Sequence, residues 1–141
     1  MELCPGRTLQ EFIDERRKTS KMDWKENFYY FQQILEGIKH LHEQNIIHWD
    51  LKPSNIFIDS KNVLKIGDFG LAIDQAGKRD EKPSSKKKGH WDNQSMLSIK
   101  VGTPFYLSPE QQQEKQYDEK VDIYSLGLIL FELCSNFKTS H

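Results

Sequence analysis

The feature that most constrains the fold is a long apolar segment near the C-terminal end of the sequence. Residues 121–134 read VDIYSLGLILFELC, and a helix over this range would carry apolar side chains on nearly every face. Such a helix lies in the middle of a hydrophobic core and needs neighbours on all sides. The sequence ends seven residues later, so we expect the core around this helix to be incomplete.

Elements that could pack against this helix precede it. From Asn27 to Gln44, apolar residues recur every three or four positions, which predicts an amphipathic helix, and a weaker helical pattern covers residues 9–17. Asn45 follows the longer helix and suits the left-handed turn that often ends helices. Residues 55–59 and 62–66 are short β-branched or aromatic runs, which predict a hairpin with Ser60 and Lys61 between its strands.

Composition excludes several classes of protein. At 141 residues the chain has the length of one domain, and 20 basic against 21 acidic residues leave no field that would draw it to nucleic acid or a membrane. Cys4 and Cys134 lie at opposite ends without a C-x-x-C spacing, which favours a reducing compartment, and we predict a cytoplasmic protein. The sequence shows no charged leader and no apolar run long enough to span a membrane.

The segment 74–94 differs in composition from the rest of the chain. It has almost no large apolar residues, so it cannot bury enough surface to offset the entropy of ordering, and we predict a disordered insertion. Its SSKKKGH run could be a nuclear address or a nucleic-acid patch, but a solvated loop is favoured. Nucleic acid is therefore not an expected partner of this region.

Three short motifs carry the chemistry: HWDLKPSN at 48–55, DFG at 68–70 and SPE at 108–110. Each alone could be a polar loop or a turn, but their joint occurrence in this order, with a hairpin between the first two, is hard to obtain by chance. Together they resemble the protein kinases, whose catalytic loop H-R-D-L-x-x-x-N, metal-binding D-F-G and A-P-E occur in the same order. VGTPFYLSPEQ and VDIYSLGLILFEL look most like the serine/threonine kinases that phosphorylate the α subunit of translation initiation factor 2.

The resemblance covers the whole chain and implies a fold. Residues 1–141 would be a partial protein kinase domain, from the hinge through the central helix, and thus an incomplete C-terminal lobe that is mainly α with short β-hairpins. The N-lobe, with its glycine-rich strands and lysine, and the last helices would be missing. A fragment, a partial gene model and a truncated isoform all stay open, and we expect these residues alone to be inactive.

The resemblance also implies an activity and the residues that perform it. The parent protein would transfer the γ-phosphoryl group of ATP to Ser or Thr of a protein, initiation factor 2 α being the favoured substrate, in the control of translation under stress. Asp50 would accept or orient the substrate hydroxyl, and Lys52 would neutralise the γ-phosphate. Asn55 and Asp68 would hold Mg²⁺ through side-chain oxygens, the ligands that this hard cation prefers. The cofactors implied are therefore ATP and Mg²⁺.

Other residues are assigned less directly by the resemblance. Backbone groups of Glu2 and Cys4, in the opening MELC, would meet the adenine edge at the hinge. Thr103 would tie the substrate-binding loop to the catalytic residues, although a turn threonine explains it too. Asp122 resembles the buried Asp that bonds the catalytic-loop backbone, although a surface charge at a helix N-terminus is the alternative. His40 and His42, two apart on a predicted helix, are expected to be surface or packing residues and not a metal site.

Trp49 departs from the family pattern, which has Arg at this position. That Arg pairs with a phosphate on the activation segment, and Trp cannot form such a charge-assisted bond. Ser98 is the best-placed candidate for activation-segment phosphorylation, but its phosphate would meet no Arg at position 49. A natural loss of phosphate control, a damaging variant and an error in the sequence remain open.

A different class of function is a non-catalytic, pseudokinase-like binding module whose basic loop engages a partner. Retention of Asp50, Lys52, Asn55 and Asp68 argues against this reading, because a binding module does not require the whole set. Whether the parent forms a homodimer is left open by the sequence.

Overall fold

The structure is a computed structural model that describes residues 6–67, 73–74, 106–113 and 118–135. Its elements, in chain order, are β1 (Gly6–Thr8), α1 (Leu9–Thr19), α2 (Trp24–Glu43), β2 (Ile46–Ile47), the 3-10 turn η1 (Pro53–Asn55), β3 (Ile56–Asp59), β4 (Leu64–Ile66), β5 (Ile73–Asp74), α4 (Pro109–Gln112) and α5 (Lys120–Cys134). The predicted class, mainly helical with short β-hairpins, is confirmed. None of the described helices has the length and apolar character needed to cross a membrane.

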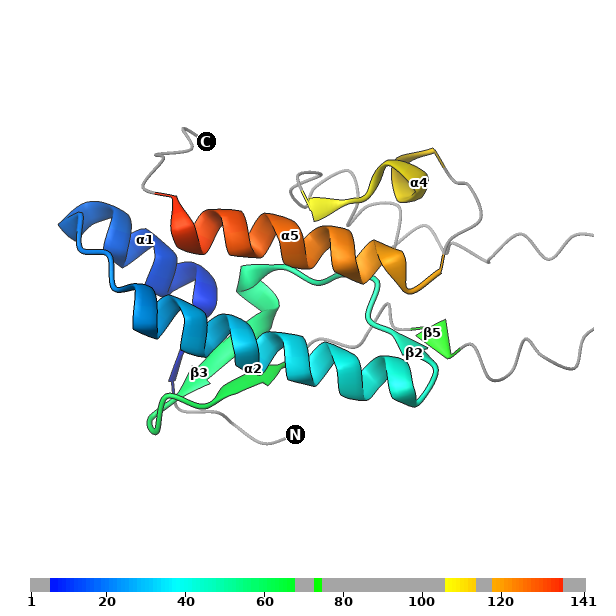
Figure 1. Cartoon of the computed structure of the whole chain (residues 1–141), viewed down its shortest axis with the longest axis horizontal. Helices are drawn as coiled ribbons and strands as arrows, with labels where there is room; N and C mark the ends of the chain where they lie inside the picture. Colours follow the sequence, from blue (N-terminus) through cyan, green and yellow to red (C-terminus); the bar gives the residue numbers. More distant parts are fainter. Residues whose placement is uncertain (1–5, 68–72, 75–105, 114–117, 136–141) are drawn as a thin grey trace, which may run out of the picture.

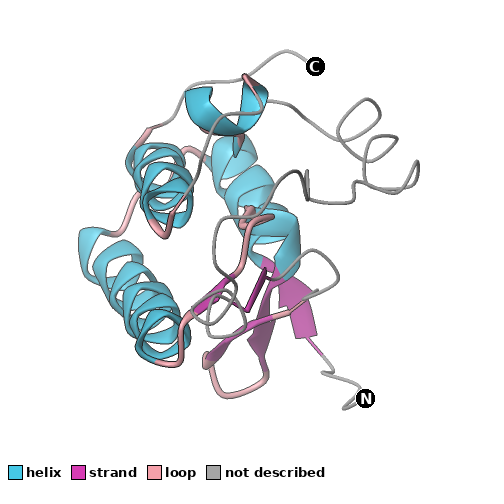
Figure 2. Ribbon diagram, turned by 90° about the vertical axis from the view of Figure 1, so that its right-hand side faces the viewer, coloured by secondary structure: helices cyan, strands magenta, loops and turns pink. Residues whose placement is uncertain are grey.

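The helices and strands occupy different parts of the molecule. Helices α2 and α5 lie side by side, with α1 against one end of the pair (Figure 1). Strands β1, β3 and β4 form an antiparallel sheet in the order β1-β3-β4, in which Ile58 of β3 lies opposite Arg7 on one side and Leu64 on the other. Strands β2 and β5 form a second antiparallel pair. Figure 2 shows the strands gathered at one end of the molecule, with helices beside them.

Helix α2 begins three residues earlier than its apolar pattern predicts. Asp23 is the N-cap, and its carboxylate accepts hydrogen bonds from the backbone N–H groups of Lys25 and Glu26. This satisfies donors that the helix itself leaves unpaired, so the helix starts at Trp24 despite the exposure of that side chain. At the other end, Asn45 has a φ of 60°, the left-handed conformation predicted for it.

The hairpin of β3 and β4 is confirmed, but its second strand starts at Leu64 and not at residue 62. The Asp59 carboxylate accepts hydrogen bonds from the backbone N–H groups of Lys61 (2.8 Å) and Val63 (3.0 Å), while Asn62 takes a φ of 61°. These groups turn the chain before pairing resumes. The Val63 N–H, and then that of Lys61, hold the pKa of the Asp59 carboxyl below its usual value.

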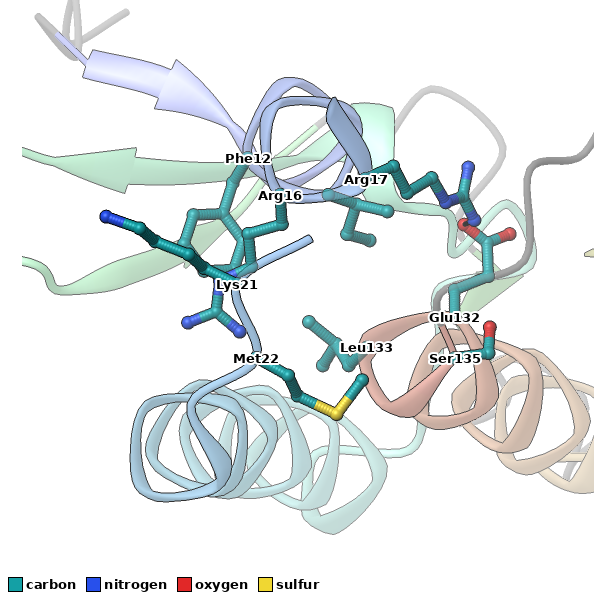
Figure 3. A pocket seen from close by; sticks show the side chains of 9 residues that line it. Phe12, Arg16, Arg17, Lys21, Met22, Glu132, Leu133 and Ser135 are labelled. Atoms are coloured by element: carbon teal, nitrogen blue, oxygen red, sulfur yellow. Dashed lines mark hydrogen bonds and ion pairs between the residues drawn. The ribbon is translucent and has the colours of Figure 1, made fainter. Parts of the chain in front are cut away.

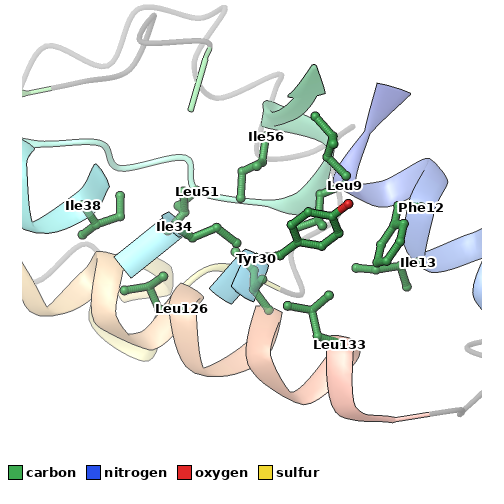
Figure 4. Packing of buried hydrophobic residues seen from close by; sticks show 12 residues of the cluster. Leu9, Phe12, Ile13, Tyr30, Ile34, Ile38, Leu51, Ile56, Leu126 and Leu133 are labelled. Atoms are coloured by element: carbon green, nitrogen blue, oxygen red, sulfur yellow. The ribbon is translucent and has the colours of Figure 1, made fainter. Parts of the chain in front are cut away.

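The core forms where α1, α2, α5, β3 and the segment between β2 and η1 meet (Figure 4). Helix α2 contributes one residue per turn on its buried face, and α5 contributes a matching stripe. The buried apolar side chains of the cluster are Leu9, Phe12, Ile13, Tyr30, Ile34, Ile38, Leu51, Ile56, Ile58, Leu126, Ile129 and Leu133. Gly37 lets α2 approach β4 closely, since a Cβ there would lie 2.8 Å from the Ile66 side chain. Burial of each of these aliphatic side chains contributes about 1.5 to 3 kcal/mol to the free energy of folding.

Helix α5 is buried on one side only within the described part of the chain. Leu126, Ile129 and Leu133 are almost completely enclosed, whereas Ile123 is 46% and Phe131 is 53% exposed. The sequence predicts apolar neighbours on every face, and the described elements supply them on the face toward α2. Among the described residues, the apolar side chains on the other face of α5 therefore stay exposed.

A buried acidic residue on α5, Glu132, bonds two other segments beside a pocket that it helps to line (Figure 3). Glu132 accepts a hydrogen bond from the Tyr106 hydroxyl and pairs with the Arg17 guanidinium at 3.3 Å. Ser125 donates to the Tyr106 carbonyl at 3.0 Å. The segment preceding α4 is thus bonded to α5 at two points, and α1 is bonded to the same carboxylate.

Because Tyr106 is buried and bonded to Glu132, we expect the free energy of unfolding to fall at alkaline pH. Burial, followed by the hydrogen bond to Glu132, raises the pKa of Tyr106 above its ordinary value of 10.0. The unfolded chain then releases this proton first, so the free energy of unfolding falls as pH rises above 10, by up to about 1.4 kcal/mol per pH unit from this group. The measurement is the free energy of unfolding in urea at several pH values above 10. It should decline less steeply with pH in Tyr106→Phe than in the wild type. Tyr124→Phe, at an exposed position on α5, is the control and should decline as the wild type does.

Candidate active site

The segment between β2 and η1 packs against the core through Leu51 and is hydrogen-bonded to α4 and α5. Leu51, in its centre, is only 1% exposed and belongs to the hydrophobic cluster. The neighbouring side chains of Asp50 and Lys52 are each 26% exposed. Alternation along the loop therefore buries the apolar residue and leaves the two charged residues on either side of it reachable from solvent.

Asp122, near the start of α5, fixes the beginning of this segment. Its carboxylate is 1% exposed and accepts hydrogen bonds from the backbone N–H of His48 to Oδ2 (2.9 Å) and of Trp49 to Oδ1 (3.0 Å). The His42 ring of α2 completes the set, with Nε2 2.8 Å from Oδ2. The predicted buried role of Asp122 is confirmed. His42, expected to be a surface or packing residue, takes part in the site as a partner of this carboxylate.

Trp49 has an unusual backbone conformation. Its φ is 74°, in the left-handed region that bulky residues rarely adopt. Both of its backbone polar groups are bonded by side chains: the N–H by Asp122, and the carbonyl by Nε2 of Gln111 on α4, at 2.9 Å. These bonds offset a conformational cost of about 1 to 2 kcal/mol. The indole is 4% exposed and therefore lies inside the protein.

His48 links the catalytic segment to the end of β4. The backbone N–H of Asp50 donates to Nδ1 at 3.3 Å, and Nε2 lies 2.9 Å from the carbonyl oxygen of Gly67. Because Nδ1 accepts, the ring proton belongs on Nε2, which donates to Gly67. The N–H of Gly67 in turn donates to the Asn55 carbonyl at 2.8 Å. Residue 67 is thus bonded on both sides to the catalytic segment.

Asp50, Lys52 and Asn55 come together as the sequence predicts. Nδ2 of Asn55 donates to the backbone carbonyl of Asp50 at 2.8 Å and approaches its Oδ2 at 3.3 Å. Nζ of Lys52 lies 3.7 Å from the same Oδ2. The arrangement places one carboxylate, one ammonium group and one amide within a few ångströms, with the amide nitrogen turned toward the carboxylate.

One described residue of this cluster, Asn55, offers an oxygen that suits a magnesium ion. Because Nδ2 of Asn55 is engaged by Asp50, the amide oxygen is the atom that could serve as a metal ligand, and hard oxygen is what Mg²⁺ requires. The hairpin brings Gly67, the residue before Asp68, against Asn55. Asp68 itself lies outside the described residues, and so does its approach to Asn55.

Several predicted residues also lie outside the described part of the chain: Glu2, Cys4, Ser98, Thr103 and residues 75–94 of the predicted insertion. Residue 74, the first of that insertion, pairs with Ile46 in the β2–β5 ladder. The predictions for the other residues stay as the sequence makes them.

Two residues of the site were not found from the sequence. His42 and Gln111 act through contacts with residues 80 and 62 positions away, which no local pattern reveals. A partial signal exists for Gln111, because Ser-Pro-Glu-Gln matches a capping box in which Gln bonds the backbone of the cap. That bond is present, but the second one, to Trp49, is not part of the motif.

Comparison with known proteins defines the class. The model of the protein kinase domain matches residues 1–140, so the chain belongs to the protein kinase family. Its relatives include the probable serine/threonine-protein kinase ifkB of Dictyostelium discoideum, 42% identical over 99% of this chain and 12% of that protein.

The more particular likeness is to kinases of initiation factor 2 α. The eIF-2-alpha kinase GCN2 of Schizosaccharomyces pombe is 40% identical over 99% of this chain and 9% of its own length. The eukaryotic translation initiation factor 2-alpha kinase 3 of Bos taurus is also 40% identical, over 99% of this chain and 12% of that protein. The chain thus spans only 9 to 12% of these three relatives.

Replacing Asp122 by Asn should destabilise the protein. The amide keeps one acceptor, but its NH₂ group then faces a backbone N–H or the His42 ring, so at least one buried donor loses its partner. Loss of such a bond to a charged group costs about 1.5 to 3 kcal/mol. The measurement is the free energy of unfolding in urea.

Asp118→Asn is the matched control for this substitution. Asp118 is exposed and accepts one hydrogen bond from the N–H of Lys120, which Asn can also accept. Equal stability of Asp122→Asn and Asp118→Asn would contradict the importance assigned to the buried carboxylate.

Proposed function

We propose that this chain forms the C-terminal lobe of a serine/threonine protein kinase that transfers the γ-phosphoryl group of ATP to the α subunit of translation initiation factor 2. The observation that carries the proposal is the cluster of Asp50, Lys52 and Asn55 on a loop fixed by Asp122. The names of the relatives support the substrate. We further propose that the kinase domain includes all of residues 1–141 and that the protein acts in the cytoplasm.

The chemistry follows from the positions of the charged groups. Asp50 accepts the proton of the substrate hydroxyl, whose oxygen forms the new bond to the γ-phosphorus while the bond from that phosphorus to the oxygen of ADP breaks. Lys52, 3.7 Å from this carboxylate, lies where it can neutralise charge on the moving phosphoryl group. Asn55 keeps the Asp50 carboxylate oriented through its amide NH₂.

Magnesium, held by Asn55 and Asp68, would supply charge neutralisation at the phosphates. The residues of this chain would supply the positioning and electrostatics on the C-lobe side of the site, on which phosphoryl transfer mainly depends. The partial exposure of Asp50 and Lys52 leaves both groups accessible to a protein substrate, while the buried contacts of Asp122 keep the loop in one conformation.

Replacing Asp50 by Asn tests the proposed catalytic role. Asn has nearly the same shape and can still accept from Asn55, but it cannot take a proton, so turnover should fall by about a hundredfold or more. The assay is ³²P transfer to purified initiation factor 2 α by the protein at its natural length. Asp118→Asn makes the same chemical change at an exposed site and should retain activity. If the wild type transfers no phosphate under these conditions, a non-catalytic binding module becomes the better interpretation.

Replacing Trp49 by Arg tests whether the protein has lost phosphate control. The backbone bonds to Asp122 and Gln111 do not involve the side chain, so the wild type should be active regardless of the phosphorylation of Ser98. Arg at position 49 should restore a partner for a phosphate at Ser98, a contact of about 1.5 to 3 kcal/mol, and make activity sensitive to phosphatase. Trp49→Leu, which removes the indole without adding charge, is the control. An inactive wild type with an active Trp49→Arg variant would instead mark Trp49 as an inactivating change.

A further inference from the structure

The side-chain amide of Gln111 makes two hydrogen bonds to backbone groups in different parts of the fold. Its Oε1 accepts from the N–H of Ser108, the N-cap of α4, at 2.9 Å, and its Nε2 donates to the carbonyl of Trp49 at 2.9 Å. Gln111 is 8% exposed and Ser108 is fully buried. The amide therefore spans from the start of α4 to the catalytic loop through the protein interior.

The Trp49 carbonyl is a sensitive point for such a bond. Asp122 binds the N–H of the same residue. The following peptide group, which leads into Asp50, is bonded at both ends: Gln111 donates to its carbonyl at 2.9 Å, and its N–H donates to Nδ1 of His48 at a longer 3.3 Å. At a φ of 74° this peptide is not in a favoured conformation for Trp and depends on its partners. Without the Gln111 bond this peptide would keep only the longer bond to His48, so it would rotate more easily and move the Asp50 backbone.

We propose that Gln111 is a positioning residue, which fixes the Trp49 peptide and thereby couples the start of α4 to the catalytic loop. This rests on the proposed kinase function, because it assigns a role within that reaction. Gln111 touches no reacting group in this arrangement. Its effect on catalysis would be transmitted through the backbone of Trp49 to Asp50.

The role requires an amide and not merely a helix-capping side chain. Glu at this position would still accept from the Ser108 N–H, so the capping box would survive. Its second oxygen, however, would face the Trp49 carbonyl oxygen without a hydrogen, and two acceptors repel each other. Gln111→Glu thus removes one of the two functions of the side chain and preserves the other.

Gln112→Glu provides a closely matched control. Gln112 is the next residue of α4, is exposed, and also donates its amide hydrogen to a backbone carbonyl, that of Leu107 at 2.9 Å. The two variants therefore introduce the same charge on the same helix and lose the same kind of bond. They differ in whether the lost bond leads to the catalytic loop.

The experiment uses the protein at its natural length, with initiation factor 2 α as phosphate acceptor. For Gln111→Glu we expect kcat to fall about tenfold at neutral pH with KM for ATP unchanged, because the variant loses positioning and not nucleotide contacts. A protonated Glu regains the donor, so the kcat ratio of variant to wild type should rise as pH falls from about 8 to about 6. The titratable groups His48, Asp122 and His42 bond the same stretch, but both proteins contain them, so their titration cancels in the ratio.

Hydrogen–deuterium exchange over residues 46–55 gives a second measurement that does not need activity. Exchange of these amides should be about tenfold faster in Gln111→Glu than in the wild type, and unchanged in Gln112→Glu. Gln111→Met, which loses both amide bonds without adding charge, should also exchange faster and takes the place of Gln111→Glu if that variant does not fold.

The outcomes separate the two proposals. If the wild type transfers no phosphate, the kinase function fails, and the exchange data alone decide the role of Gln111. Unchanged exchange and unchanged kcat in Gln111→Glu would overturn the proposed role. So would an equal loss of activity in Gln112→Glu, since the effect would then come from charge on α4 and not from the bond to Trp49.

Discussion

The geometry of the candidate site depends on one buried carboxylate. An ionised group enclosed in protein is costly unless hydrogen-bond donors surround it, and Asp122 has three: two consecutive backbone N–H groups and the ring of His42. Directing two consecutive N–H groups at one carboxylate bends the chain sharply and places Trp49 in the left-handed region. The loop therefore has the conformation in which its backbone N–H groups can bind the buried carboxylate. Leu51 then anchors that loop in the core.

Local patterns in the sequence predicted the main helices and the hairpin, because hydrophobic periodicity and turn residues act over a few positions. Two observed boundaries differ from the predicted ones because a side chain binds the backbone there. Asp23 caps α2 and lets it start earlier, and Asp59 binds the turn so that β4 starts later. The cluster of Asp50, Lys52 and Asn55 was predictable since its residues lie within six positions of one another. The roles of His42 and Gln111 were not, because each depends on how separate elements pack, and an isolated sequence gives no sign of which distant groups will meet.

Trp49 shows that the backbone and the side chain of one position can serve separate purposes. The bonds from Asp122 and Gln111 involve only the N–H and the carbonyl, which every residue except proline provides. The side chain can therefore change without removing these bonds, and the indole finds a buried location of its own. A substitution that looks severe in the motif thus leaves the contacts that shape the loop in place, while it removes the side-chain charge expected at this position in the family.

The sequence separation between Asp122 and its partners also affects how the protein folds during synthesis. The carboxylate lies 74 residues after His48 and 73 after Trp49, so the loop emerges from the ribosome well before the group that shapes it. At about 5 to 20 residues per second, the interval is roughly 4 to 15 s. During that time Leu51 can pack against residues of α1 and α2 but not against α5. A nascent chain halted before residue 122 would carry the entire catalytic-loop sequence without the carboxylate that binds its first two N–H groups.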